Sequence, residues 1–185
     1  MKQKENTRGE VILAGSGGGG VKSAGETLAS AASLHFEHVT CVPFYSIAKR
    51  GGLSESTVIF SDTEIASPLL SQAQVIVLLD SSVLRNMEDR LAPGGLLILE
   101  RDSLKDPVQR KDIRVLIVPA VETAFKLGFG LGASFVLIGA YVAASKALFP
   151  ELIEKEIERK FAGREKIISS NKEAFRQGLK LGAAG

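Results

Sequence analysis

The sequence predicts an α/β fold with three layers: a mainly parallel, Rossmann-like sheet with helices on both faces, and a helical C-terminal part. Three observations support this prediction. Short apolar runs rich in β-branched residues alternate with segments of helical periodicity. A glycine-rich loop separates the first apolar run from the first helical segment. The last third of the chain is almost entirely helical in pattern. Strands that alternate with helices form parallel sheets covered on both faces.

The first half of the chain supplies three expected strands and one helix. Residues 1–9 are polar and charged, which indicates a flexible leader, so we expect a single domain over residues 10–185. The expected elements are a strand over 10–14, a helix over 21–36, a strand over 38–42 that Pro43 stops, and a strand over 56–60.

The second half repeats the alternation and ends in helices. The expected strands cover 74–79, 96–100 and 114–118, with a turn at Pro93-Gly94-Gly95, and the expected helices cover 81–91, 121–127, 133–148, 150–161 and 164–181. Residues 127–145 carry no charge and are nearly long enough to cross a bilayer. Their flanks lack an aromatic belt with basic loops, so we expect a buried helix that faces the sheet or a partner.

Composition excludes several classes of function. A net charge of +2 is too small to indicate a nucleic-acid or membrane-surface protein. Cys41 is the only cysteine, so the 185 residues can form no internal disulfide and cannot hold an iron–sulfur cluster alone. Cys41 lies in an apolar run, which favours a buried thiol over a nucleophile. We expect a reducing cytoplasm as the setting.

The glycine loop is the first candidate binding site. Its residues, Gly15, Ser16, Gly17, Gly18, Gly19 and Gly20, satisfy G-x-G-x-x-G between a strand and a helix. Such a loop can present backbone N–H groups to a phosphate, or it can only let the helix pack closely on the strand. A dinucleotide site also needs an acid at the end of the second strand, and here Glu37 precedes that strand. No Lys-Ser or Lys-Thr closes the loop at the spacing that a P-loop requires.

A second loop is expected to reach the same edge of the sheet. It contains Tyr45, Arg50, Gly51 and Gly52. Ligands of open α/β sheets bind at the carboxyl ends of strands, so the two loops should converge. Arg50 offers a fork of donors to a phosphate or carboxylate, although a solvent-exposed arginine in a flexible turn is the alternative.

These two loops carry a resemblance to a known family. The chain resembles the gamma subunits of 2-oxoacid:ferredoxin (or other acceptor) oxidoreductases, which act on pyruvate, 2-oxoglutarate, 2-oxoisovalerate or indolepyruvate. In the family, this loop reads G-x-G-G-Q-G, and in the present chain Gly19 stands at the position of the glutamine. The family then has a tyrosine-containing loop that ends in R-G-G, which Tyr45 and Arg50-Gly51-Gly52 match. Further matching positions are Ser61-Asp62, Pro93-Gly94-Gly95, Gly139-Ala140, and Asn171, Ala174, Phe175 and Gly178.

The resemblance implies a subunit without cofactors of its own. The family carries out coenzyme A-dependent oxidative decarboxylation of 2-oxoacids. Thiamine diphosphate, magnesium, iron–sulfur clusters and coenzyme A are then expected in the complex, on alpha, beta and ferredoxin-like delta partner subunits. The gamma-type domain would help to shape the approach of coenzyme A, and ferredoxin or another acceptor would be an indirect partner. The alternatives are a free-standing NAD(P)-dependent enzyme and a nucleotide-binding regulator.

No catalytic acid–base set stands out in the sequence. His35 and His38 are expected to be boundary histidines rather than metal ligands. Asp62 and Glu64 fit a turn and a helix start. Asp80, with Ser81 and Ser82 after it, is expected to cap a helix at a strand end.

Overall fold

A six-stranded mixed sheet organises the chain. The computed structural model describes residues 8–17, 19–46, 52–128 and 132–184. The strand order is β2-β3-β1-β4-β5-β6, and all strands except β3 run in one direction. The strands are β1 (Arg8–Ser16), β2 (His38–Tyr45), β3 (Leu53–Ser61), β4 (Ala73–Leu78), β5 (Leu91–Glu100) and β6 (Arg114–Val118). The predicted α/β class with a mainly parallel sheet is confirmed.

The reversed strand β3 results from a hairpin with β2. β3 lies between β2 and β1 and runs antiparallel to both, and it is the strand that follows β2 in the described part of the chain. The prediction that Pro43 ends the second strand was wrong, because β2 continues to Tyr45. Proline lacks a backbone N–H, but β2 is an edge strand, so its outer side needs no ladder hydrogen bond.

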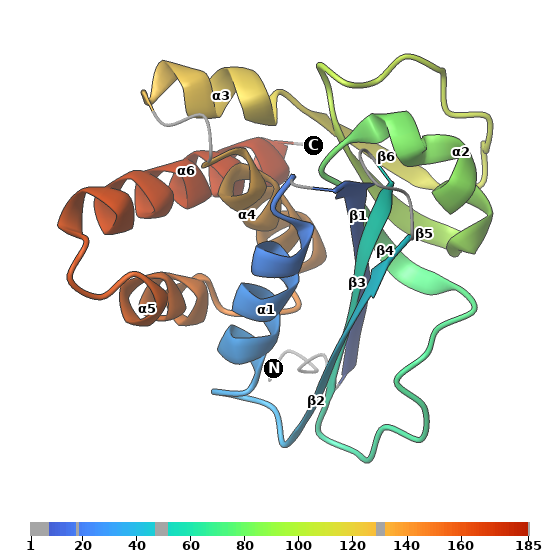
Figure 1. Cartoon of the computed structure of the whole chain (residues 1–185). Coiled ribbons are helices and arrows are strands. Elements are labelled where there is room, and N and C mark those ends of the chain that lie inside the picture. The colour runs from blue at the N-terminus through green and yellow to red at the C-terminus, as the bar shows by residue number, and fades with distance from the viewer. Residues whose placement is uncertain (1–7, 18, 47–51, 129–131, 185) are drawn as a thin grey trace.

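Helices cover the two faces unequally. Figure 1 shows α1, α4, α5 and α6 on one side of the sheet and α2 on the other. Each face has its own apolar cluster, built on Val11, Leu13 and Val77 for the first and on Ile12, Ile76 and Leu78 for the second. The helices are α1 (Val21–Ala32), α2 (Leu84–Met87), α3 (Ala120–Lys126), α4 (Ala133–Ser145), α5 (Pro150–Lys160) and α6 (Glu165–Ala184).

The predicted helix over 81–91 is broken into short turns. The 3-10 turns η1 (Ser81–Val83) and η2 (Glu88–Arg90) flank α2, and β5 begins already at Leu91. The predicted turn at Pro93-Gly94-Gly95 therefore lies within β5, where the register with β4 shifts between Ala73 and Val75. The long apolar stretch Leu91–Glu100 pairs with β4 at both ends, and this pairing takes precedence over the helical pattern.

Helix α4 is the buried helix that the uncharged segment predicts. It contributes to the first apolar cluster and packs against α6. A Cβ added to Gly139 would lie 2.2 Å from the carbonyl oxygen of Phe175, and one added to Gly178 would lie 2.0 Å from that of Val136. The small residues thus admit another helix of the same chain. None of the helices in the described ranges has the length and apolarity to cross a membrane.

Candidate functional site

The two predicted loops meet at one edge of the sheet. The backbone N–H of Gly17 donates to the carbonyl oxygen of Gly52 at 2.9 Å. The N–H of Ser46, just after β2, donates to the carbonyl of Leu53 at 2.9 Å, which closes the hairpin beside it. The end of β1 and the β2–β3 connection are therefore adjacent, as the sequence predicts. Gly18, Arg50 and Gly51 lie outside the described residues.

Two helix N-termini approach each other beside the glycine loop. Gly20 precedes α1 with φ +83°, a left-handed conformation that favours glycine. A Cβ at Gly20 would lie 3.6 Å from the hydroxyl of Ser134, which belongs to the first turn of α4. Within the described residues, neither helix has a side-chain cap or an acidic residue in its first turn. Free N–H groups and the positive ends of two helix dipoles can favour an anion at this place.

Asp80 lies at the end of β4, next to the glycine loop. The hydroxyl of Ser16 donates to its carboxylate, and the N–H of Ser82 donates to Oδ1 at 2.9 Å. Burial raises the pKa of Asp80, but the hydrogen bonds from Ser16 and Ser82 and the charge of Lys105 outweigh it, so the pKa lies below its usual value. Asp80 caps η1, as predicted, and engages the side chain of Ser16.

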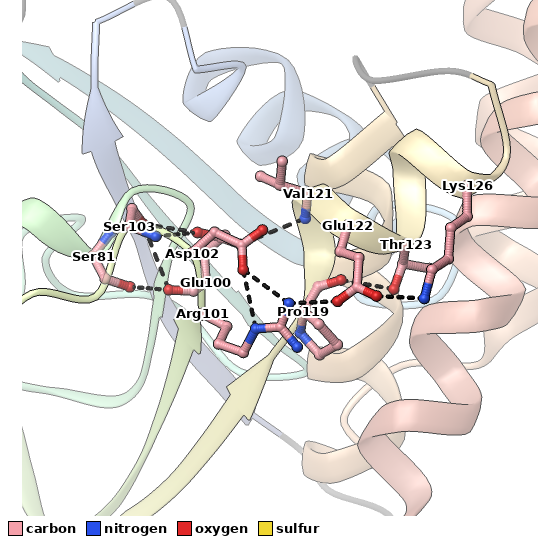
Figure 2. Close-up of polar contacts among 10 residues, drawn as sticks. All are labelled: Ser81, Glu100, Arg101, Asp102, Ser103, Pro119, Val121, Glu122, Thr123 and Lys126. Carbon is pink, nitrogen blue, oxygen red and sulfur yellow. Dashed lines mark hydrogen bonds and ion pairs between the residues drawn. The ribbon is translucent and has the colours of Figure 1, made fainter.

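A buried carboxylate that the sequence reasoning missed ties three elements together (Figure 2). Glu100, at the end of β5, is 1% exposed. Its Oε2 accepts hydrogen bonds from the N–H and the hydroxyl of Ser103, both at 2.8 Å, and Oε1 accepts the N–H of Val121 at 3.5 Å. Ser81 donates its hydroxyl to the Glu100 carbonyl at 2.7 Å. Every acceptor is used, so Glu100 holds strand ends together. The sequence signal that could have indicated this role is the single acid, Glu100, at the end of the apolar run of β5.

An exposed chain of charges continues from Glu100 to α3. Arg101 pairs with Asp102 and with Glu122, and Glu122 also pairs with Lys126 (Figure 2). The ion pairs with Lys126 and Arg101 lower the pKa of Glu122 to about 2. The opposite charges neutralise one another. Because these groups face solvent, their ion pairs stabilise the fold only weakly.

The other predicted site residues lie apart from any catalytic cluster. Tyr45 is exposed at the end of β2, and His35 contacts the rings of Phe36 and Phe149. Cys41 is half-buried rather than fully buried, with its Sγ 3.5 Å from the Ser56 hydroxyl. No group of histidine, cysteine and acidic side chains within the described ranges could hold a metal ion.

The acidic residues after β3 differ from expectation. Asp62 and Glu64 are exposed in the connection to β4, and this connection contains no helix. Glu64 is therefore not a helix-start residue. It lies in a solvent-exposed surface segment, where water solvates the two neighbouring carboxylates.

Comparison with known proteins decides the family. Residues 10–181 match the family described as pyruvate ferredoxin/flavodoxin oxidoreductase. The chain belongs to this family. It is 36% identical over 162 residues to the ketoisovalerate oxidoreductase subunit VorA of Methanothermobacter thermautotrophicus, covering 87% of the chain and 34% of the relative. It is 32% identical to the 2-oxoglutarate synthase subunit KorC of Methanothermobacter marburgensis, covering 89% of the chain and 100% of the relative.

Solved structures of the family share the fold. The gamma subunit of the keto/oxoacid ferredoxin oxidoreductase of Geobacter sulfurreducens superposes with a TM-score of 0.81 at 27% identity, covering 95% of this chain and 99% of the other. The pyruvate oxidoreductase subunit PORC of Thermotoga maritima gives 0.80 at 26% identity, covering 95% and 97%. The chain spans about a third of the length of the VorA relatives and the full length of KorC.

Proposed function

We propose that this chain is the gamma subunit of a multi-subunit 2-oxoacid:acceptor oxidoreductase. The complex would carry out the coenzyme A-dependent oxidative decarboxylation of a 2-oxoacid of the 2-oxoglutarate or pyruvate class. The chain would be inactive alone. Thiamine diphosphate, magnesium and iron–sulfur clusters would reside on alpha, beta and ferredoxin-like delta subunits in the cytoplasm, with ferredoxin or another acceptor as the electron sink.

The match to KorC supports this proposal most strongly. It extends over the whole relative, and that relative is named as one subunit of a 2-oxoglutarate synthase. A single half-buried cysteine is consistent with clusters carried elsewhere, because a cluster needs several thiolates. The cofactor would supply the hard chemistry, and this chain would supply shape and fixed dipoles beside it.

The edge that joins the glycine loop to the β2–β3 connection is the proposed contribution of this chain. The two N-termini that approach each other at Gly20 and Ser134 would favour a phosphate of coenzyme A or a carboxylate of a partner. Gly15, Gly17, Gly19 and Gly52 would bring backbone close to that group. Gly18, Gly51 and Arg50 belong to the same proposal on sequence grounds, with the Arg50 guanidinium paired to the anion.

The strand arrangement argues against a free-standing nicotinamide enzyme. In a dinucleotide-binding fold, the strand after the glycine-loop helix lies parallel beside the first strand and ends in an acid that holds the ribose. Here the neighbours of β1 are antiparallel β3 and parallel β4, and β2 ends in Phe44 and Tyr45 on the sheet edge. Within the described residues, β2 therefore ends without the acid that would hold that ribose.

Co-expression with the neighbouring subunits tests the proposal. We expect the chain to co-purify with larger subunits and the complex to reduce an acceptor with 2-oxoglutarate or pyruvate and coenzyme A. Arg50→Ala should lower turnover or raise the KM for coenzyme A, and Arg164→Ala serves as a matched control on the surface before α6. A chain that purifies alone from its native source, or turnover by the isolated chain, would refute the assignment.

A further inference from the structure

A cavity of about 460 Å³ lies at the edge of the sheet opposite the glycine loop. The starts of β1, β4, β5 and β6 line it, together with the end of α4. Gly9, near the start of β1, lines the cavity, and Gly17 of the glycine loop follows the end of β1, eight residues later. At about 3.3 Å per residue, the two places are roughly 26 Å apart. The volume falls in the range typical of small-ligand sites.

An irregularity in the sheet opens this cavity. Ala73 pairs with Leu91 and Val75 pairs with Leu96, so Gln74 alone lies opposite residues 92–95 of β5. Among the extra residues, Gly94 has φ +74°, and its N–H donates to the Asp112 carbonyl at 2.8 Å. The floor beneath them is apolar and formed by Val75 and Leu96, with the buried Tyr141 at the back.

The charges at the rim are not balanced within the described residues. Glu10 is engaged by Arg8, with 2.7 Å between Oε1 and Nη2. Arg114 lines the cavity and also a second hollow of about 310 Å³, which shares Leu96 and adds Lys146. Neither Arg114 nor Lys146 forms an ion pair with any part of the chain that the structure describes. Two cationic groups therefore face one pair of joined hollows.

Lys146 adopts an unfavourable backbone conformation. Its φ is +54°, and it is the one residue other than glycine with a positive φ in the described ranges. It follows the last turn of α4, where its N–H donates to the carbonyl of Val142 at 3.0 Å. Glycine is the usual residue at this position because it has no Cβ to strain. Lys146 and Arg114 both line the second hollow, so a role for the lysine charge there would offset this strain.

We propose that these joined hollows bind a small organic anion. The anionic group, a phosphate or carboxylate, lies between Arg114 and Lys146. An apolar or planar body lies over the apolar floor of Val75 and Leu96, toward Tyr141. This site is separate from the glycine loop, so it stands or falls independently of the proposed enzyme complex.

Titration of the full chain with AMP, followed by amide NMR, tests the proposal. AMP carries one phosphate and a planar body of suitable size. We expect saturable shifts of the Gly94 and Gly95 amides, and affinity reduced about tenfold in Arg114→Gln because one charge-assisted contact is lost. Lys166→Gln, which also replaces a positive charge by an amide, at an exposed position in the first turn of α6, should bind AMP as the wild type does. Absent shifts at Gly94 and Gly95, or equal affinities of wild type and Arg114→Gln, would overturn the site.

Two further measurements separate the parts of the proposal. Inorganic phosphate should bind more weakly than AMP, since the nucleoside part of AMP contributes contacts, and equal affinities would overturn the role of the apolar floor.

Lys146→Gly should raise the melting temperature by removing backbone strain while weakening AMP binding. A variant with unchanged AMP affinity would show that Lys146 serves only the end of the helix, where a cation also interacts favourably with the dipole.

Discussion

The closest contact between two helices gives the sharpest stability test. Gly178→Ala in α6 would place a Cβ 2.0 Å from the carbonyl oxygen of Val136 in α4. Ordinary contacts begin at 3.4 Å, so the helices must separate by about 1.4 Å at this point. The carbonyl belongs to regular helix backbone and the Cβ is fixed directly to the backbone of α6, so neither atom can rotate away. Overpacking of this kind costs about 3 kcal/mol at the upper end of its range.

The expected net effect includes an opposing term. Alanine is favoured over glycine in a helix by about 1 kcal/mol. The variant should therefore lose about 2 kcal/mol of unfolding free energy, equivalent to a melting temperature lower by roughly 4–8 °C for a chain of this length.

Urea and thermal unfolding followed by circular dichroism measure this loss. Ser169→Ala, at an exposed position of the same helix, is the matched control and should be neutral or slightly stabilising, because only helix propensity changes. If Gly178→Ala is as stable as the wild type, the two helix backbones are not in contact and the packing argument fails.

Two further predictions concern carboxylates at the carboxyl edge of the sheet. The pKa of Asp80 is lower in the folded chain, so its contribution to stability is present above about pH 4 and lost as pH falls below that value. Asp80→Asn should therefore destabilise the chain at pH 7 and have less effect at pH 3, in urea unfolding at both pH values; an equal effect at both would contradict the assigned hydrogen bonds. Glu100→Gln should cost about 1–3 kcal/mol, because an amide N–H₂ would face the N–H donors of Ser103 and Val121. Exposed Glu122→Gln should leave thermal stability nearly unchanged, and similar losses in the two variants would refute the buried role of Glu100.

Local patterns determined much of this protein. The alternation of apolar runs with helical segments predicted the α/β class, and four of the expected helices lie within a few residues of α3, α4, α5 and α6. The glycine loop between β1 and α1 was also predictable, because a strand, a turn and a helix that follow one another in the chain are governed by neighbouring residues. The family resemblance drew on the same local motifs and was confirmed.

Tertiary contacts decided the remainder. Whether β3 runs parallel or antiparallel to β1 depends on hydrogen bonds between residues far apart in sequence, such as the pairing of Val11 with Val58. The packing partner of Gly139 could not be inferred from the sequence, because a small residue indicates a close contact without identifying the other segment. In the structure, that segment is α6. Glu100 and the cavity at Arg114 likewise depend on which strand ends become neighbours. Sequence periodicity fixes which face of an element is apolar, but only the packed sheet determines which elements share that face and what meets at its edges.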